Sequence, residues 1–317
     1  MSDTTADDII DRRRLRRKLT FWRIIALCIV LVGLFAIAFA SLPEDRFGAK
    51  SRPHIAKVRI EGTILEDEDL IGVLEDAGKS EAVKGVILAI DSPGGTTAGG
   101  EAIYEAVRKL AEKKPVAAQI GTVGASAAYM IAAAADHIVA RKTSIVGSIG
   151  VILQYPNVAE MLDKLGVNME VIKSTPLKGE PSMFGPPAPG AKEMMRAMLL
   201  DSYDWFKSIV ADRRGFSEAE IARLADGSVF SGRQALDRKL IDEVGGIEAA
   251  KKWLASQGVD DKMKVIEWKK QERGADLFWA GAIAHWLGFD LGKKSAVETL
   301  QERLFLDGMI SVWHVGG

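Results

Sequence analysis

The feature that most constrains the fold is an alternation of short apolar strands with helices, beginning near residue 55. Residues 55–61 alternate apolar and charged side chains, as a half-buried strand does. Two apolar runs, 86–90 and 116–120, each end in a glycine-rich turn that a helical pattern follows. Strands that alternate with helices need crossover connections, which produce a parallel sheet covered on both faces. The sequence therefore predicts an α/β domain with a parallel sheet and crossover helices.

The alternation continues along the chain and is interrupted by one proline-rich segment. Five of the ten prolines fall between 174 and 189, and a long loop of this kind is often functional or disordered. After this loop the chain becomes helical, with two sequence signatures of capped helix starts. The further predicted elements are helices over 126–135 and 158–165, strands over 138–140, 169–172 and 263–268, and capping boxes at Ser217–Glu220 and Ser231–Gln234.

The N-terminus is first basic and then apolar. Seven Lys and Arg residues between 12 and 23 precede an uncharged stretch of 20 residues over 24–43, which suits a helix that crosses a hydrocarbon core about 30 Å thick. The basic residues before this stretch, with Glu44 and Asp45 after it, place the N-terminus in the cytoplasm and the remainder outside. We predict a single transmembrane anchor over 24–43.

A cleaved secretory signal is the alternative, because Ala38-Phe39-Ala40 fits a cleavage site. A cleaved apolar region normally spans only ~7–15 residues, so a retained anchor is favoured, and both interpretations export the main domain. The predicted organisation is a cytoplasmic basic tail over 1–23, the anchor, a main domain over 55–255, and an aromatic-rich C-terminal extension over 256–317 to which no role is assigned.

Composition excludes several kinds of site. A formal net charge of -1 gives no electrostatic basis for binding nucleic acid. The single cysteine, Cys28, lies in the apolar stretch, so one chain cannot build a disulfide, a zinc site or a thiol nucleophile from cysteine. The four histidines are scattered without metal-ligand spacing, so we expect no metal site. They are His54, His137, His285 and His314.

Ser126 is a candidate nucleophile because it stands between an apolar strand and a helix of small residues. A serine at the first turn of such a helix projects from the carboxyl edge of a parallel sheet, where open α/β folds bind ligands. Unpaired amides at the helix N-terminus favour an oxyanion. The alternative is that Ser126 only caps the helix or packs in the core. The final glycine of the Gly-x-Ser-x-Gly elbow is also missing.

A second glycine-rich turn, Asp91-Ser92-Pro93-Gly94-Gly95, ends the preceding strand. It should lie beside the Ser126 turn, and glycine lets a backbone amide approach a substrate closely. One amide from Gly94 or Gly95, with that of Ala127, would form a two-donor oxyanion hole. The alternative is a simple strand-ending turn.

A serine hydroxyl needs an adjacent proton acceptor. His137 lies at the far end of the helix that Ser126 begins, and the other histidines lie outside the predicted site, so no histidine triad is evident. A desolvated lysine can replace histidine as the base. Lys178, in the proline-rich loop, is the candidate, although taken alone it is more typical of a solvated surface lysine.

Four motifs, taken together, resemble those of the signal peptide peptidase A family, in its short bacterial form. They are 124–129 (Gly-Ala-Ser-Ala-Ala-Tyr), 91–95 (Asp-Ser-Pro-Gly-Gly), 147–151 (Gly-Ser-Ile-Gly-Val) and Lys178-Gly179. Residues 229–235 and 240–242 resemble a further family segment. Lys239 departs from it, because many members have glycine there, which leaves the local turn in doubt. The resemblance covers roughly residues 55–250.

The resemblance implies a Clp protease/crotonase-like fold and a Ser–Lys dyad. Ser126 would attack the scissile carbonyl, Lys178 would accept its proton, and Gly94, Gly95 and Ala127 would hold the oxyanion. It also implies a ring-like homo-oligomer in which neighbouring subunits share each active site. The enzyme would need no metal or nucleotide cofactor. It would sit in the bacterial inner membrane, with its catalytic domain outside the cytoplasm, and degrade remnant signal peptides and other short hydrophobic peptides.

Three alternatives remain open at this stage. A crotonase-type hydratase or isomerase would use the same scaffold, but no carboxylates are placed for that chemistry. A stomatin-associated membrane protease belongs to the same superfamily, but its serine and lysine tend to lie nearer in sequence. An inactive membrane scaffold would only bind peptides, and the intact set of Ser126, Lys178 and Gly94-Gly95 disfavours it.

Overall fold

The computed structural model describes residues 21–29, 32–33, 50–269 and 310–312. Its contacts divide the chain into two units, Met1–Arg52 and Pro53–Gly317. In the first unit, residues 21–29 and 32–33 are helical. Most of the predicted anchor lies outside the described residues, and no described helix is both long and apolar enough to span a bilayer.

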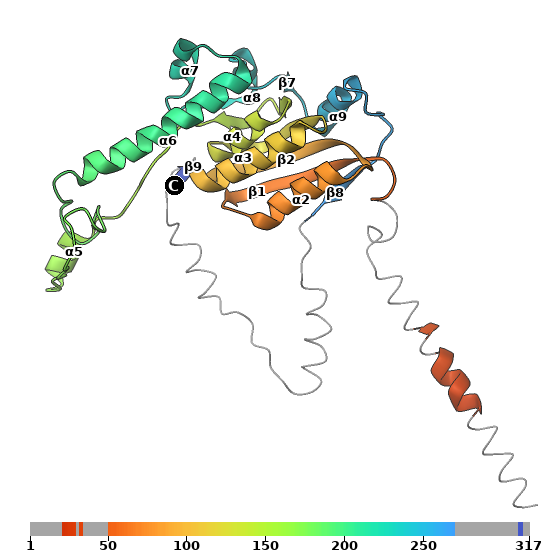
Figure 1. Ribbon diagram of the computed structural model, residues 1–317, viewed down its shortest axis with the longest axis horizontal. Coiled ribbons are helices and arrows are strands. Elements are labelled where there is room, and N and C mark those ends of the chain that lie inside the picture. Colours follow the sequence, from red (N-terminus) through yellow and green to blue (C-terminus); the bar gives the residue numbers. More distant parts are fainter. Residues whose placement is uncertain (1–20, 30–31, 34–49, 270–309, 313–317) are drawn as a thin grey trace, which may run out of the picture. The chain divides into compact units, whose positions relative to one another are not determined.

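Nine strands of the second unit's described residues form one sheet, which the helices cover (Figure 1). The main path runs β6–β5–β3–β2–β1–β8, while β4 and β9 pair with β3 and β2, and β7 pairs with β4. The strands are β1 His54–Ile64, β2 Val83–Thr96, β3 Val116–Ala125, β4 His137–Ala140, β5 Ile145–Gly147, β6 Val229–Ser231, β7 Glu243–Val244, β8 Val265–Trp268 and β9 Ile310–Val312.

The strand pairings are mixed. The central pairs β1–β2, β2–β3 and β3–β5 are parallel, as predicted, and so are β1–β8, β3–β4 and β4–β7. The pairs β5–β6 and β2–β9 are antiparallel, so the expectation of a wholly parallel sheet is wrong at these two places. Both antiparallel strands are only three residues long, which is too short for an alternating pattern to reveal their direction.

Helices pack on both faces of the sheet. They are α2 Glu68–Lys79, α3 Thr97–Ala111, α4 Ala127–Ala134, α6 Ala191–Arg214, α7 Glu218–Leu224, α8 Gly232–Asp237 and α9 Ile247–Ser256. The remaining described helix of this unit, α5 Ala159–Lys164, buries no residue. On β2, Val86 and Leu88 join a core that includes residues of α2, α3 and α4, whereas Ile87 joins a second core with Leu254 of α9. Successive side chains of β2 therefore face opposite helical layers, which explains its continuous apolar run.

The predicted strand over 169–172 is absent. These residues form no strand and are exposed, with Val171 at 58% and Ile172 at 102% of their reference areas. They follow α5, a helix without any buried residue. The prediction is wrong because an apolar run need not be buried in the sheet, and this run lies on the surface of the chain.

Local helix signals were more reliable. Both predicted capping boxes form: the Ser217 and Ser231 side chains accept the amides of Glu220 and Gln234, and those side chains return the bond. The predicted helix at 126–135 is α4, in which every residue is buried. The strand predicted at 263–268 is β8, which pairs with β1 and so extends the main sheet beyond residue 255.

Lys239, the departure from the family pattern, adopts a left-handed conformation with φ 59°. Its amide donates to Leu236 O, and the Leu240 amide donates to Ala235 O, which ends α8 in a tight turn. The turn is stabilised further because the buried Tyr129 hydroxyl donates to Leu240 O at 2.8 Å. The turn therefore forms despite the missing glycine, and its conformation explains why glycine suits this position.

We expect Lys239→Gly to raise the free energy of unfolding of the full chain by about 1 kcal/mol, because glycine removes the steric cost of the left-handed conformation. Chemical denaturation followed by circular dichroism measures the change. Lys142→Gly is the matched control: its φ is not positive, so glycine there should leave stability unchanged or lower it. A Lys239→Gly protein no more stable than the parent would contradict the explanation.

Candidate active site

The carboxyl ends of β2 and β3 lie side by side, and they bring together the two predicted glycine-rich turns. Ser92 of β2 is in register with Gly124 of β3. Asp91 fastens the two turns together, because its carboxylate accepts the Val123 amide at 3.0 Å. The predicted position of residues 91–95 beside the Ser126 turn is therefore confirmed.

Ser126 joins β3 to α4 in a backbone conformation that few residues other than glycine adopt, with φ 58° and ψ −123°. Such conformations cost of order 1–3 kcal/mol and persist only where the surrounding structure holds them. Here the Ser126 amide donates to Gly147 O at 2.8 Å, and Ser126 O accepts the Met130 amide at 3.0 Å. The residue is buried, with 1% of its area exposed.

Ser126 occupies the N-cap position of α4, but it does not cap the helix with its side chain. The helix begins at Ala127, whose amide lies among the first turn that α-helical bonding leaves unpaired. A strained backbone turn at a helix start, with a hydroxyl not used for capping, is the geometry found at nucleophilic serines.

Residues 147–151, which the sequence marks only through the family resemblance, support the Ser126 turn in the structure. Gly147 has φ +109°, and a Cβ there would lie 2.9 Å from Ser228 O. Ser148 also has positive φ, 51°, and its amide donates to Ser228 O at 2.8 Å. Because Gly147 O is the acceptor for Ser126, this second strained turn positions the first.

Gly94 and Gly95 are required for different reasons. Gly94 has φ +110°, and its amide donates to the Ser92 hydroxyl at 3.1 Å. A Cβ on Gly95 would lie 1.8 Å from Ile64 O of β1, so no side chain fits there. Since the Gly94 amide is engaged inside its own turn, Gly95 is the stronger candidate for an oxyanion donor.

Lys178 lies on the loop between α5 and α6, in a pair of consecutive turns. Its amide donates to Thr175 O at 3.2 Å, and the Glu180 amide donates to Leu177 O at 3.3 Å. The Lys178 side chain is exposed and forms no hydrogen bond or ion pair with another described residue. The structure therefore does not bring Lys178 to Ser126 within one chain.

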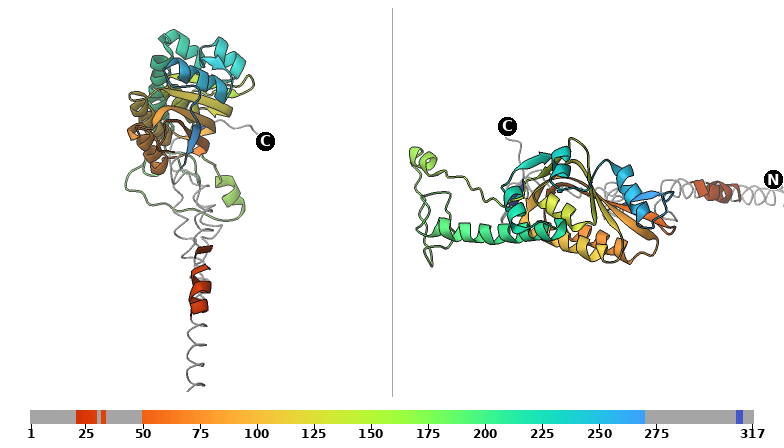
Figure 2. Two further views of the ribbon diagram at one scale, coloured as in Figure 1. Left: turned by 90° about the vertical axis from the view of Figure 1, so that its right-hand side faces the viewer. Right: turned by 90° about the horizontal axis from the view of Figure 1, so that it is seen from above.

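The position of α6 explains this separation. Only the C-terminal half of α6 packs on the core, through Phe206, Ile209 and Val210, and Arg213 donates from it to Ala133 O of α4 at 3.0 Å. The remainder of α6 projects from the sheet together with α5 (Figures 1 and 2). From Phe206 to the start of α6 is about 22 Å at 1.5 Å per residue. We call α5, the following loop and this part of α6 the arm, residues 158–200.

The two described histidines lie at other sites. His137 stacks on Trp253 with ring centroids 5.0 Å apart, at the end of α4 opposite to Ser126. His54 accepts the Trp268 indole N–H at 2.9 Å, at the amino end of β1. His285 and His314 lie outside the described residues. The predicted exclusion of His54 and His137 as bases agrees with these positions.

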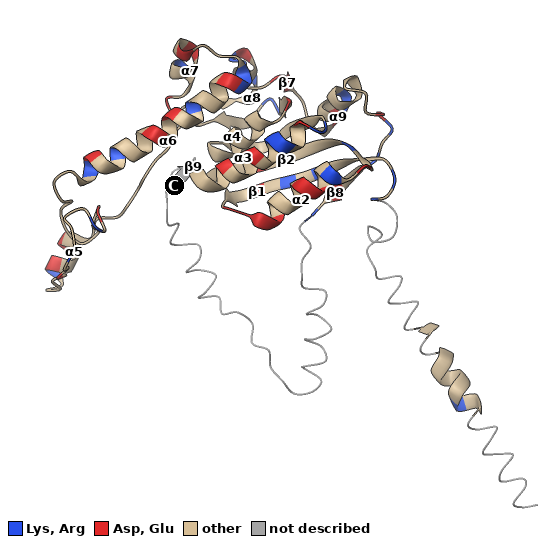
Figure 3. Cartoon of the chain, viewed as in Figure 1, with Lys and Arg blue, Asp and Glu red and all other residues tan. Residues whose placement is uncertain are grey.

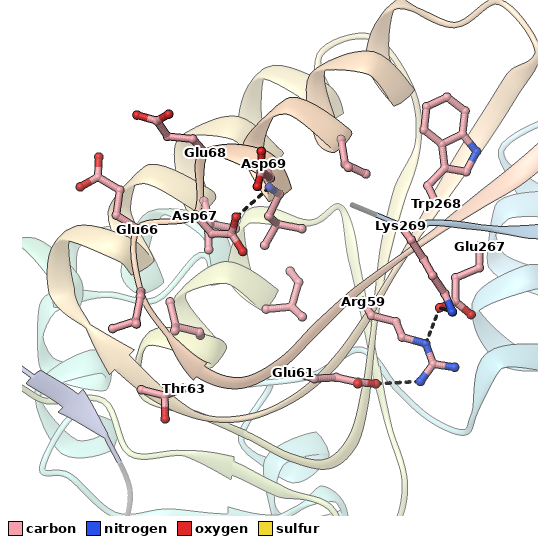
Figure 4. A pocket seen from close by; sticks show the side chains of 16 residues that line it. Arg59, Glu61, Thr63, Glu66, Asp67, Glu68, Asp69, Glu267, Trp268 and Lys269 are labelled. Carbon is pink, nitrogen blue, oxygen red and sulfur yellow. Dashed lines mark hydrogen bonds and ion pairs between the residues drawn. The ribbon is translucent and has the colours of Figure 1, made fainter. Parts of the chain in front are cut away.

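A cavity apart from the predicted catalytic residues is lined largely by charged side chains, several of which are paired. The cavity has a volume of about 1000 Å3 and lies beside β1 and the start of α2 (Figure 4), and none of the predicted catalytic residues lines it. Arg59 there binds Glu61 at 2.8 Å and Glu267 at 2.9 Å, and Asp67 caps α2. Acidic and basic residues are interspersed along α6 (Figure 3). No described cluster of His, Cys, Asp and Glu could hold a metal ion.

Comparison with known proteins agrees with this geometry. The model of peptidase family S49 matches residues 108–260, and the Clp protease model matches residues 68–146. A Methanocaldococcus jannaschii protein that carries the provisional name protease is 37% identical over 70% of this chain and 70% of its own length. A second provisional protease, from Synechocystis, is 36% identical over 69% of this chain and 79% of its own.

An Enterococcus faecium protein provisionally named signal peptide peptidase SppA is 30% identical, over 79% of this chain and 74% of its own length. The Clp protease-like α/β fold, with its mixed sheet, and the position of the Ser126 turn fit these matches. By its sequence and its fold, the chain belongs to peptidase family S49.

Proposed function

We propose that this peptidase is a membrane-anchored serine endopeptidase with a Ser126–Lys178 dyad, and that it degrades remnant signal peptides and other short hydrophobic peptides. The observation that carries the proposal is the strained backbone of the buried Ser126, at the start of α4 and beside the Gly94-Gly95 turn. The provisional SppA name of the Enterococcus faecium relative supports the substrate class.

In the proposed reaction, the Ser126 hydroxyl oxygen attacks the scissile carbonyl carbon while its proton passes to Lys178 Nζ. The amides of Gly95 and Ala127 stabilise the negative oxygen that forms, and Gly94 shapes the turn that presents Gly95. Lys178 then gives the proton to the leaving amine, and an acyl-enzyme results. Water, with Lys178 again as base, hydrolyses the acyl-enzyme and restores Ser126.

The edge of β2 supports binding of an extended peptide. In the structure β9 pairs antiparallel with β2, with Gly95 opposite Ser311 and Thr96 opposite Ile310. Peptide substrates commonly add a strand to an exposed sheet edge, where main-chain hydrogen bonds hold them. A substrate that took the position of β9 would pair with the Gly94-Gly95 turn, and we propose that its scissile carbonyl then faces the Ser126 turn.

The dyad is proposed to form between subunits of a homo-oligomeric ring. A lysine becomes a base when it is desolvated, but Lys178 is exposed in its own chain. The arm that carries it also has many exposed apolar side chains, more than a solvated surface needs. They include Met161, Leu165, Val167, Met169, Val171 and Ile172. A neighbouring subunit would cover this surface, desolvate Lys178 and supply the Ser126 turn.

The proposed membrane location rests on the basic residues before 24 and the uncharged stretch 24–43. It places the peptidase domain on the extracytoplasmic side of the inner membrane, where released signal peptides remain. A stomatin-associated membrane protease, or a scaffold that only binds peptides, is the alternative function. Turnover of leucine- and alanine-rich reporter peptides by the full chain distinguishes either peptidase from the scaffold.

We expect Ser126→Ala to lower the turnover of such a reporter by at least about 1000-fold, and Lys178→Ala to do the same, because neither half of a dyad works alone. Both variants should keep the unfolding transition and oligomer size of the parent. Lys192→Ala, an exposed lysine at the start of α6, is the control and should be fully active. Parent-like turnover by Ser126→Ala or Lys178→Ala would refute the dyad.

Shared sites predict complementation. When Ser126→Ala and Lys178→Ala subunits assemble at random in equal amounts, about one quarter of the sites should combine an intact serine with an intact lysine, so about one quarter of parent activity should return. Differently tagged subunits allow mixed oligomers to be purified before the assay. Verified mixed oligomers that remain inactive would show that each chain forms its own site.

A further inference from the structure

Glu180 is the only carboxylate within two residues of Lys178, and its side chain is 4% exposed although it lies on the arm. A buried carboxylate is costly unless it is paired and fully hydrogen-bonded. Glu180 meets that requirement on both oxygens. Oε1 accepts from the ammonium of Lys173, while Oε2 accepts the Ser182 amide at 3.3 Å and the Ala188 amide at 3.0 Å.

These contacts enclose the turn that carries Lys178. Lys173 precedes the turn, Ser182 follows it, and Ala188 stands just before α6 begins at Ala191. The ion pair between Lys173 and Glu180 therefore closes a short loop around Lys178, and the Ala188 bond ties that loop to the start of α6. Apart from the contacts of the Glu180 carboxylate, two long backbone hydrogen bonds hold the turn among the described residues. The Lys178 amide donates to Thr175 O, and the Glu180 amide donates to Leu177 O.

From this arrangement we infer that Glu180 and Lys173 form a clamp that positions Lys178, so that the arm presents its amine to the Ser126 turn in a fixed place. The inference rests on the proposed function, since it assigns the device that aims the proposed base. Glu180 and Lys173 are positioning residues and contact neither the substrate nor Ser126. A base displaced by about 1 Å can lose about 100-fold in rate, so a flexible loop would not serve.

The charge state of the clamp suits a neutral environment. The hydrogen bond from Lys173, and then that from the Ala188 amide, hold the pKa of the Glu180 carboxyl below its ordinary value. A carboxyl with a lowered pKa in the folded chain contributes stability at pH above its unfolded value and loses it as pH falls through the lowered pKa. The clamp is therefore complete at neutral pH.

The test uses the full chain with Glu180→Gln, which keeps the shape of the side chain but removes its charge. We expect kcat for the reporter peptide to fall about 100-fold with KM nearly unchanged, because Glu180 does not touch the peptide. Lys173→Met should lower kcat by the same factor. Lys173→Arg, which retains the cation, should have the kcat of the parent. Matched controls away from the arm are Glu112→Gln and Lys113→Met, both at exposed residues, and they should be fully active.

A second measurement reports on the loop itself. Amide hydrogen exchange should speed up at Ser182 and Ala188 in Glu180→Gln, and it should remain at the parent rate in Glu112→Gln. Unchanged exchange would overturn the clamp, and faster exchange with parent kcat would overturn its role in positioning. The proposed function fails separately if Ser126→Ala retains the turnover of the parent. In that case Glu180 has no base to position, but the exchange result still decides whether the clamp between Glu180 and Lys173 exists.

Discussion

The hydrogen bond from the Ser126 amide to Gly147 O holds the turn on which the rest of the site depends. It fixes a backbone conformation that serine rarely adopts, and it does so from β5, a strand of three residues. β5 ends at Gly147, which has a positive φ, and the following residue is fixed because the Ser148 amide donates to Ser228 O. Strain at Ser126 is thus supported by a second strained turn, and both lie at the carboxyl edge of one sheet.

The parallel central strands are what make this support possible. Because β1, β2, β3 and β5 run in the same direction, their carboxyl ends meet, and each contributes one part of the site. β2 provides the Gly94-Gly95 turn, β3 provides Ser126, and β5 provides the acceptor for Ser126. β1 approaches Gly95 so closely that no Cβ fits between the strands. The glycines therefore satisfy a packing requirement as well as a chemical one.

Sequence patterns predicted the central elements because those elements are governed by local rules. An apolar run of five residues in β2 indicates burial on both faces, and a serine with glutamate three residues later indicates a capping box. The same reasoning placed residues 91–95 beside Ser126, since adjacent parallel strands end at the same edge. Even the doubtful turn at Lys239 has a local explanation in its left-handed φ of 59°.

The failures arose where apolar character serves something other than the core of one chain. Residues 169–172 have the composition of a buried strand, but they form no strand and Ile172 is fully exposed. An apolar pattern shows that a segment tends to be buried, but it does not show which part of this chain, or which other chain, would bury it. Likewise, the strained φ of Ser126 depends on Gly147, which lies far away in sequence. The occupied amide of Gly94 and the contacts of Glu180 depend on atomic geometry, which no spacing rule encodes.

The same distinction separates the two halves of the proposed dyad. Ser126 is held by the sheet and by α4, so its position is as rigid as the core that contains it. Lys178 has no such support, because the arm buries almost nothing of its own chain around α5. A loop without apolar packing is ordered by its polar contacts. Among the described contacts of this loop, those of the Glu180 carboxylate, which is bonded on both oxygens, are the most numerous. Rigid packing thus places the proposed nucleophile, whereas the ion pair between Lys173 and Glu180 is proposed to place the base.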